Sequence, residues 1–392
     1  MIERTYLDWN ATAPLRAEAR SAVIAALNEL GNPSSIHREG RTVRRLVEQA
    51  RERVAALVGA EPRNVVFTSG ATEANMLALT SAYESAKDKP RRCERLVISA
   101  IEHASVRSGG RFPASQIDEF AANADGVVDL SGLERRLNEL KWRGAPSPLV
   151  SLMAANNETG VVQPVREAAA MVHAVGGLLH VDAVQVAGRI PFDINEMDVD
   201  LLSISAHKMG GPMGVGALVK RTSTPNITEP HIKGGGQERG ARAGTQNVPG
   251  IVGFGVAAAA AMETIVSDAE RMRALRDRLE VGLGRGPAVI FGEAAERLPN
   301  TTLFAVPGLK AEIALINLDL GGFAVSSGSA CSSGKVTASH VLTAMGVAPE
   351  LVTGAIRVSI GPTTTENEID SFLEAWTKVV AGLSRDKGGL AA

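Results

Sequence analysis

The stretch DLLSISAHKMGGPMGVG, residues 200–216, indicates the fold class of this chain. Its apolar run predicts a buried strand, which ends in Ser205, His207 and Lys208 before a glycine-rich loop. Such a sequence is typical of an open α/β sheet, where ligands bind beyond the carboxyl ends of strands and near helix N-termini. Lys208 is therefore a candidate Schiff-base lysine, although a lysine considered alone is more often a solvated residue at a strand end.

Other predicted strands end in polar residues in the same way. The β-rich runs 64–68, 96–100, 149–155 and 177–181 are followed by Thr72, His103, Asn156, Asp182 and Gln185. Helical patterns such as 133–140 and 165–175 separate these runs. Strands that alternate with helices predict an α/β protein with a mostly parallel, doubly wound sheet. The polar residues are then expected at one edge of that sheet.

Two segments are candidates for anion binding. The turn TSGAT, which ends at Thr72, would present helix-start amides to a phosphate, although an ordinary helix cap explains Thr72 equally well. The segment HIKGGGQERGARAGTQN, residues 231–247, is glycine-rich and basic and carries Thr245. By contrast, GNPSSIHREGR, residues 31–41, which includes Asn32, is more typical of a connecting loop, and residues 6–16 predict an extended arm.

The C-terminal part contains a second set of elements and two residues of chemical interest. Strands are predicted at 301–306 and 355–360, and helices at 311–318 and 366–383. Arg357 in the second strand is a planar cation suited to a carboxylate. Cys331 lies among serines and glycines, where a nucleophilic thiol and a structural thiol are equally consistent with the pattern. Cys93, in the charged linker ESAKDKPRRCER, is expected to be an exposed thiol without a catalytic role.

Composition limits the classes of function. The chain has 392 residues, of which 45% are hydrophobic and 21% charged, and 41 Lys and Arg nearly balance 43 Asp and Glu. No bulk charge therefore favours nucleic acid or an anionic membrane as a partner. The first residues lack the apolar core of a signal peptide, and the apolar run 252–262 is shorter than the roughly 20 residues of a membrane span, so a cytoplasmic protein is expected. Two distant cysteines suggest neither a disulfide framework nor a CxxC metal site.

Together, the lysine, the strand-end aspartate, the histidine, the phosphate donors and the arginine are the parts of a pyridoxal phosphate enzyme. The sequence motifs also resemble those of a known family over nearly the whole chain. The motifs that carry this resemblance are YLDWNATAP, GNPSSIHREGR, TSGATEAN, EHASV, NNETGVVQP, HVDAVQVAG, SISAHKMGGPMGVG, GGGQERGARAGTQN, SSGSACSSG and IRVSIG. They are similar to those of cysteine desulfurases of the NifS/IscS type in the class V aminotransferase group, and SSGSAC resembles the subgroup with the longer catalytic loop.

The resemblance implies the α/β architecture called fold type I of pyridoxal phosphate enzymes. It implies a large cofactor-binding domain, residues 15–258, with a mostly parallel sheet of the seven-stranded type flanked by helices. Residues 1–14 and 259–392 would form a smaller α+β domain that carries the cysteine loop and the arginine. The reaction would convert L-cysteine to L-alanine and leave the sulfur as a persulfide on the enzyme, for iron–sulfur cluster assembly or other acceptors.

The resemblance also implies a role for each matching residue. Lys208 would hold pyridoxal 5'-phosphate, His103 would stack on its ring and act in catalysis, Asp182 would pair with the pyridine nitrogen, and Gln185 would contact the ring hydroxyl. Thr72, Ser205 and His207 would bind the phosphate, with Thr245 of a second subunit. Asn156 would contact cofactor and substrate, Arg357 and Asn32 would bind the substrate carboxylate, and Cys331 would be the catalytic nucleophile.

The expected partners are L-cysteine, a second copy of the chain, and a sulfur-acceptor or iron–sulfur scaffold protein. A selenocysteine lyase or another class V enzyme is the main alternative, because it would share Lys208 and Asp182 without requiring Cys331. A cofactor-binding scaffold without sulfur release is a second alternative. A metal hydrolase built on His180, Asp182 and His207 is disfavoured, since no HExxH-like spacing supports it, and no metal is expected.

Overall fold

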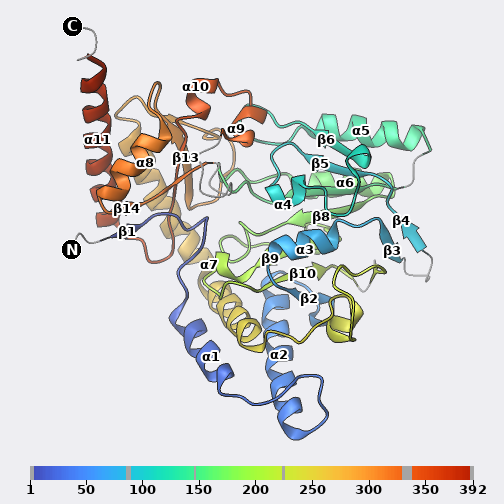
Figure 1. Ribbon diagram of the computed structural model, residues 1–392. Coiled ribbons are helices and arrows are strands. Elements are labelled where there is room, and N and C mark those ends of the chain that lie inside the picture. Colours follow the sequence, from blue (N-terminus) through green and yellow to red (C-terminus); the bar gives the residue numbers. More distant parts are fainter. Residues whose placement is uncertain (1–3, 85–89, 145–146, 223–225, 329–337, 389–392) are drawn as a thin grey trace.

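The computed structural model describes residues 4–84, 90–144, 147–222, 226–328 and 338–388 (Figure 1). A sheet of seven strands forms its centre, in the order β2-β10-β9-β8-β7-β5-β6. Their bounds are β2 (Val65–Thr68), β10 (Gly216–Lys220), β9 (Leu201–Ser205), β8 (Leu178–Asp182), β7 (Leu149–Met153), β5 (Leu96–Ser99) and β6 (Ile117–Phe120). Only β10 is antiparallel to its neighbours in this sheet, so the predicted mostly parallel α/β sheet is confirmed.

Helices cover both faces of the central sheet. The alternation of side chains along each strand divides the core: in β2, Phe67 packs into one buried cluster and Val66 into another. The first cluster joins the sheet to α2 (Arg38–Leu57), α5 (Leu130–Trp142), α6 (Val165–Ala174) and α7 (Val248–Leu283). The second cluster joins the opposite face to α3 (Ala71–Ala78) and α4 (Ala104–Arg107). Apolar runs buried on both faces explain why these strands read as continuous hydrophobic segments.

The C-terminal part forms a second sheet with its own core. Its order is β12-β13-β16-β15, with β12 (Val289–Ile290), β13 (Thr301–Ala305), β16 (Ile356–Ser359) and β15 (Ser326–Ser327). The end of α7, α8 (Ala311–Leu320) and α11 (Glu366–Gly388) pack on it through a cluster that contains Phe304, Phe372 and Trp376. Two short helices, α9 (His340–Ala344) and α10 (Pro349–Val352), precede β16.

The N-terminal arm joins this C-terminal layer. Its strand β1 (Thr5–Tyr6) pairs in parallel with β14 (Phe323–Ala324), and Asp8 bridges to Ser359 at the end of β16. Figure 1 shows both ends of the chain on the side of α8 and α11. The arm then passes back toward α1 (Ala17–Leu27) and the central sheet. The boundary expected between residues 258 and 259 falls within α7, and the division into two domains stays a prediction.

By length and composition α7 would pass as a membrane span, which is weak evidence when considered alone. Here α7 packs against α1 and α2, and an added Cβ at Gly255 would lie only 2.5 Å from the Ala50 Cα atom of α2. Because this contact needs the absence of a side chain, Gly255 allows two helix backbones to approach closely. We therefore assign α7 as a core helix.

The prediction for Cys93 is wrong. The thiol is 0% exposed and packs in the second core cluster with Tyr83 and Leu96. The segment around it is not only a linker, because β3 (Ala82–Glu84), β4 (Pro90–Arg92) and β11 (Asn226–Ile227) form a small sheet there. The run of charges hid these short strands, whose pairing is decided by contact with a segment more than a hundred residues away in the sequence.

Candidate active site

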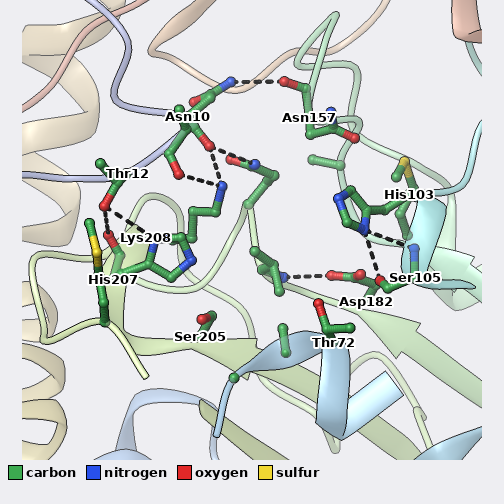
Figure 2. Close-up of a pocket in the computed structure, with 18 of the residues that line it drawn as sticks. Asn10, Thr12, Thr72, His103, Ser105, Asn157, Asp182, Ser205, His207 and Lys208 are labelled. Atoms are coloured by element: carbon green, nitrogen blue, oxygen red, sulfur yellow. Dashed lines mark hydrogen bonds between the residues drawn. The ribbon is translucent and has the colours of Figure 1, made fainter. Parts of the chain in front are cut away.

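A cavity of about 620 Å³ lies where the ends of β7, β8 and β9 meet the start of α3 and the N-terminal arm. Eight of the predicted site residues line it, and Figure 2 shows His103 and Lys208 on opposite sides of the pocket. These eight residues are Thr72, His103, Asp182, Gln185, Ser205, His207, Lys208 and Arg357. The carboxyl ends of parallel strands thus meet at one edge, as expected for a ligand site in an open α/β sheet.

Lys208 follows β9 and reaches the N-terminal arm. Its Nζ donates to the carbonyl oxygens of Asn10 and Ala11, the latter at 2.9 Å. The neighbouring His207 contacts Thr12 of the same arm, with 3.2 Å between Nδ1 and Oγ1. Burial, with contributions from the Lys208 and Arg189 cations, lowers the pKa of His207 to about 4. His207 is therefore neutral near pH 7 and can act as a hydrogen-bond donor or acceptor without a charge.

Asp182 ends β8 as a nearly buried carboxylate, 6% exposed. Its Oδ2 accepts from Nδ2 of Asn75 at 2.9 Å, and its Oδ1 accepts from the amide of Val184 at 3.1 Å. No cation lies within 4 Å of this carboxylate in the parts of the chain that the structure describes. A buried carboxylate of this kind is suited to a ligand that supplies a protonated ring nitrogen.

A hydrogen-bonded chain connects Asp182 to His103. Asn75 Nδ2 also donates to the hydroxyl of Ser105 at 2.9 Å, and this hydroxyl lies 2.8 Å from His103 Nδ1. The backbone amide of Ser105 donates to the same Nδ1 at 3.2 Å, so in neutral His103 the proton is on Nε2. Asn75 thereby fixes both the carboxylate and the ring that face the cavity.

The start of α3 forms an open cradle at the lower end of the pocket. Thr72 and Ser205 both lie on the lower side of the pocket in Figure 2. A Cβ atom added at Gly70 or at Gly214 would meet nothing within 4 Å, so these backbones border empty space that a ligand can fill. Two hydroxyls, the amides at a helix start and the neutral His207 form a donor set for a phosphate.

Arg357 reaches the cavity from β16 of the C-terminal sheet. It is 2% exposed, and its Nη2 donates to Asp8 Oδ1 at 2.7 Å while its Nη1 donates to the carbonyl of Asn157 at 2.9 Å. Its Nε is buried and has no acceptor in the described parts of the chain. A buried guanidinium with unused donors at the cavity is suited to a carboxylate ligand.

The structure does not bring every predicted residue into this cavity. Asn156 is fully buried, with its Oδ1 accepting from the amides of Glu158 and Thr159, and Asn157 lines the cavity instead. Thr245 borders a separate hollow of about 160 Å³, and Asn32 caps the turn at Ser34. The ligand roles of these three predicted residues stay predictions. Cys331 lies outside the residues that the structure describes.

His180 does not line the cavity either. It is fully buried between the hydroxyls of Ser151 and Ser203, at 2.8 and 2.9 Å, and burial lowers its pKa to about 4. In the described ranges, no group of three or more His, Cys, Asp and Glu side chains could hold a metal ion. His180 is a core histidine whose ring nitrogens are both used by the protein.

Sequence reasoning missed several residues that complete the site. Four of them contact predicted residues far away in the sequence, namely Asp8, Asn10, Thr12 and Asn75. The other two, Ser105 and Arg189, contact His103 and Gln185, which lie two and four positions away. Arg189 is 6% exposed and donates to Gln185 and to the carbonyl of Trp9. Burial, with a smaller contribution from Arg357, lowers the pKa of Arg189 to about 9. The N-terminal arm was recognisable as extended, but nothing in its sequence indicated which residues it would contact.

The residues present fit pyridoxal phosphate. Asp182 matches a protonated pyridine nitrogen, the cradle at α3 matches the phosphate, and Lys208 supplies an amine for covalent attachment. His103 presents a ring on the opposite side from Lys208 (Figure 2). The geometry therefore agrees with a cofactor that lies across the cavity between these groups.

Comparison with known proteins gives a consistent result. Residues 5–372 match the family model described as aminotransferase class-V. A protein named cysteine desulfurase from Cereibacter sphaeroides is 44% identical, with 97% of this chain and 96% of that protein covered. A protein named cysteine desulfurase IscS from Dictyoglomus turgidum is 38% identical, with 98% and 96% covered. The solved structure of a NifS-like protein from Rickettsia africae has a TM-score of 0.87 and 36% identity, with 97% of this chain and 100% of the other covered.

Proposed function

Because this chain belongs to the class V aminotransferase family, where it is a pyridoxal phosphate-dependent cysteine desulfurase, we propose specific roles for its residues in taking sulfur from L-cysteine. The observation that supports these roles is the convergence of Lys208, Asp182, His103 and Arg357 on one cavity, although they come from distant parts of the sequence. The selenocysteine lyase alternative is not favoured, since the similar proteins are named cysteine desulfurases.

When bound, the cofactor withdraws electrons from Cα of the amino acid attached to it. Asp182 holds the proton on the ring nitrogen, because a buried carboxylate stabilises a neighbouring positive charge. Arg357 binds the substrate carboxylate and orients Cα toward Lys208, whose amine takes the Cα proton at Nζ. His103, with Nε2 protonated, can donate a proton toward the substrate.

Cys331 is proposed as the acceptor of the sulfur. Its thiolate attacks the sulfur atom of the substrate, an S–S bond forms, and the Cβ–S bond breaks. The electron pair of the broken bond stays with Cβ of the substrate, which takes up a proton and becomes the methyl group of L-alanine, and Lys208 returns a proton to Cα. The sulfur remains on Cys331 as a persulfide and passes from there to an acceptor protein, for which we propose an iron–sulfur scaffold or another sulfur carrier.

We also propose that the active form is a homodimer. Thr245 is exposed and lies away from the cavity of its own chain, in agreement with a role in the site of a second copy. Large apolar side chains around α1 and the segment after it are exposed, namely Ile24, Leu27, Leu30 and Ile36, and Met213 beside the cavity is 71% exposed. Exposed apolar side chains of this kind would be covered in a dimer. A cytoplasmic location is proposed as well, since thiol chemistry at Cys331 needs a reducing compartment.

The function is tested by purifying the protein and measuring sulfide and alanine released from L-cysteine in the presence of a thiol reductant. We expect a yellow protein that forms alanine and sulfide in equal amounts. The variant Lys208→Ala should lose both the borohydride-reducible cofactor linkage and turnover. A Lys208→Ala protein that turned over at the wild-type rate would contradict the role of Lys208, and release of selenide with no reaction of cysteine would favour the lyase.

A further inference from the structure

The proposed role of Arg357 raises the question of what orients its guanidinium. Arg357 is among the largest side chains that are almost fully buried, and the only carboxylate within 4 Å of it in the described ranges is that of Asp8. Asp8 belongs to the N-terminal arm, more than three hundred residues away in the sequence. We propose that Asp8 is a positioning residue, which holds the Arg357 guanidinium in the orientation that receives the α-carboxylate of the substrate. This inference rests on the proposed role of Arg357.

The backbone around Asp8 is fixed on both sides. The amide of Ser359 donates to the carbonyl of Leu7 at 2.8 Å, and the amide of Trp9 donates to the carbonyl of Ser359 at 3.2 Å. The hydroxyl of Tyr6 donates to the carbonyl of Asp8 itself at 3.0 Å. Asp8 therefore has a defined register against β16, the strand that carries Arg357.

This register places the two side chains together. Asp8 pairs with Ser359, and Arg357 lies two residues before Ser359, so the side chains at 357 and 359 point to the same face of the strand. Asp8 Oδ1 accepts from Arg357 Nη2 at 2.7 Å. The Asp8 side chain is only 20% exposed and that of Arg357 only 2%, so the pair is largely shielded from water.

Asp8 does not use up the binding capacity of the guanidinium. Asp8 accepts from Nη2 and the carbonyl of Asn157 from Nη1, and a guanidinium carries more N–H donors than these two contacts require. Nε is buried without an acceptor in the described parts of the chain. A substrate carboxylate can therefore bind while Asp8 stays in place.

The charges around Arg357 also favour a positioning role for Asp8 over competition with the substrate carboxylate. Arg189 is a second buried arginine, and its pKa is lowered by burial and further by the nearby Arg357 cation. Without Asp8, the Arg357 cation would be buried with a carbonyl as its remaining described partner. A long side chain without its anchoring ion pair is expected to turn toward water or toward another acceptor, and the carboxylate site would lose its geometry.

The test compares two ligands that differ only at the carboxyl group. L-Alanine carries the carboxylate and L-alaninamide does not, and their dissociation constants for the cofactor-loaded protein are measured from the change in visible absorption. For Asp8→Ala we expect the dissociation constant of L-alanine to rise about tenfold or more, with that of L-alaninamide changed less than about twofold. Asp8→Asn keeps an acceptor for Nη2 and should give a smaller rise, about threefold.

A matched control removes another ion pair of the same arm. Arg4 Nη2 contacts Asp319 Oδ1 at 2.5 Å, and both side chains are more than half exposed. Asp319→Ala should leave both dissociation constants unchanged, because this exposed pair does not line the cavity and contributes little. The ratio of cofactor to protein is measured for each variant. If Asp8→Ala does not fold, the comparison is made with Asp8→Asn.

Arg357→Met separates the failure of this inference from failure of the proposed function. Arg357→Met should abolish the preference for L-alanine over L-alaninamide; if it does not, the assignment of Arg357 is wrong. If Arg357→Met abolishes the preference but both Asp8 variants keep the wild-type value, Asp8 does not position the guanidinium. Tighter binding of L-alanine by Asp8→Ala would instead show that Asp8 competes with the substrate carboxylate for Arg357. Equal weakening of both ligands would show that Asp8 only stabilises the N-terminal arm. Either result overturns the inference.

Discussion

At the scale of single residues, the cavity combines buried charges with neutral polar groups that hold them. Asp182 is the clearest case, since both of its oxygens accept hydrogen bonds from protein donors. Glu102, directly before His103, behaves differently: burial raises its pKa to about 8, and its Oε1 accepts from the amide of Met153 at 2.8 Å. The Glu102 carboxyl group is thus protonated near pH 7 and has a structural role, whereas the Asp182 carboxylate faces the cofactor site.

Asp182→Asn is expected to reduce turnover by at least about a hundredfold, because a neutral amide no longer stabilises the protonated ring nitrogen. The free energy of unfolding should fall by only about 1–3 kcal/mol, since the amide NH₂ would face one of the two donors. Sulfide release and urea unfolding measure the two effects. Asp118→Asn is the control, because Asp118 pairs with Arg95 and Arg136 outside the cavity and should affect stability only. A loss of turnover below tenfold in Asp182→Asn would contradict the assignment.

The two cysteines should differ sharply in reactivity. After incubation with L-cysteine, mass spectrometry should find a reducible extra sulfur on the peptide that contains Cys331. None should be found on Cys93, which is 0% exposed. Cys331→Ala should still bind L-cysteine, with a visible spectral change, but should release no sulfide, whereas Cys93→Ala should keep the persulfide. Sulfide release by Cys331→Ala at the wild-type rate would refute its role as nucleophile.

At the scale of elements, a buried ion pair fixes the segment that carries Thr245. Glu238 accepts from Arg51 of α2 through both oxygens, at 2.7 and 3.0 Å, and from the amide of Phe67 in β2 at 3.0 Å. Both side chains are at most 3% exposed, and Glu238 has a φ of 47°. A non-glycine residue in this left-handed region is held there by its surroundings, here by the ion pair.

Glu238→Ala should lower the free energy of unfolding by about 3–5 kcal/mol, because it leaves the buried Arg51 cation with only the half-exposed carboxylate of Glu48, 3.2 Å from its Nε. The double variant Arg51→Met, Glu238→Leu should recover much of this loss, since it removes both charges together. Urea unfolding of the single and double variants measures the difference. A double variant that is no more stable than Glu238→Ala would show that the two residues do not act as a pair.

The histidine inside the central sheet predicts a dependence of stability on pH. Burial lowers the pKa of His180 to about 4, below the value of an exposed histidine. Between about pH 6.5 and pH 4 the unfolded chain therefore binds a proton that the folded chain does not. The free energy of unfolding should fall as the pH decreases through this window, by up to about 1.4 kcal/mol per pH unit for this group. Urea unfolding of His180→Asn at pH 6.5 and pH 5 should show a weaker decrease than wild type; an unchanged decrease would contradict the role of His180.

At the scale of the whole molecule, the proposed dimer can be tested by complementation. Lys208→Ala is expected to inactivate the protein. Thr245→Ala is expected to weaken cofactor binding about tenfold. If Thr245 serves the site of the other subunit, mixed dimers of the two variants contain one site with neither change. Co-expression with two different tags, followed by isolation of mixed dimers, should restore tight cofactor binding at about one site per dimer. Arg242 is left unchanged, because it pairs with Glu73 in its own chain.

Sedimentation of the wild-type protein provides the independent check. An active monomer would refute the dimer, whatever the complementation result. Mixed dimers without an intact site would place the role of Thr245 within its own chain.

The sequence by itself determined the α/β class and the edge of the sheet that forms the site. Buried parallel strands require continuous apolar runs, and the polar residues that end these runs must meet at one edge because the strands are parallel. Asp182, Lys208 and His103 could therefore be identified from local patterns. The strand β10 could not, since it directly follows a glycine-rich loop. The burial of Cys93 could not either, because it depends on a small sheet formed by distant segments.

Only the tertiary structure decided which groups hold the site residues in place. The contacts of Asp182 with Asn75, of Arg357 with Asp8 and of Lys208 with Asn10 join residues separated by more than one hundred positions. No local period or spacing encodes such contacts, because they depend on how the arm, the sheet and the C-terminal layer pack together. For the same reason no local pattern shows that the Asn156 side chain accepts from an amide of its own loop while Asn157 lines the cavity, and the ligand role of Asn156 stays a prediction. Local sequence patterns indicate which face of a helix or strand a residue occupies. The packing of the elements determines which residues it contacts on that face.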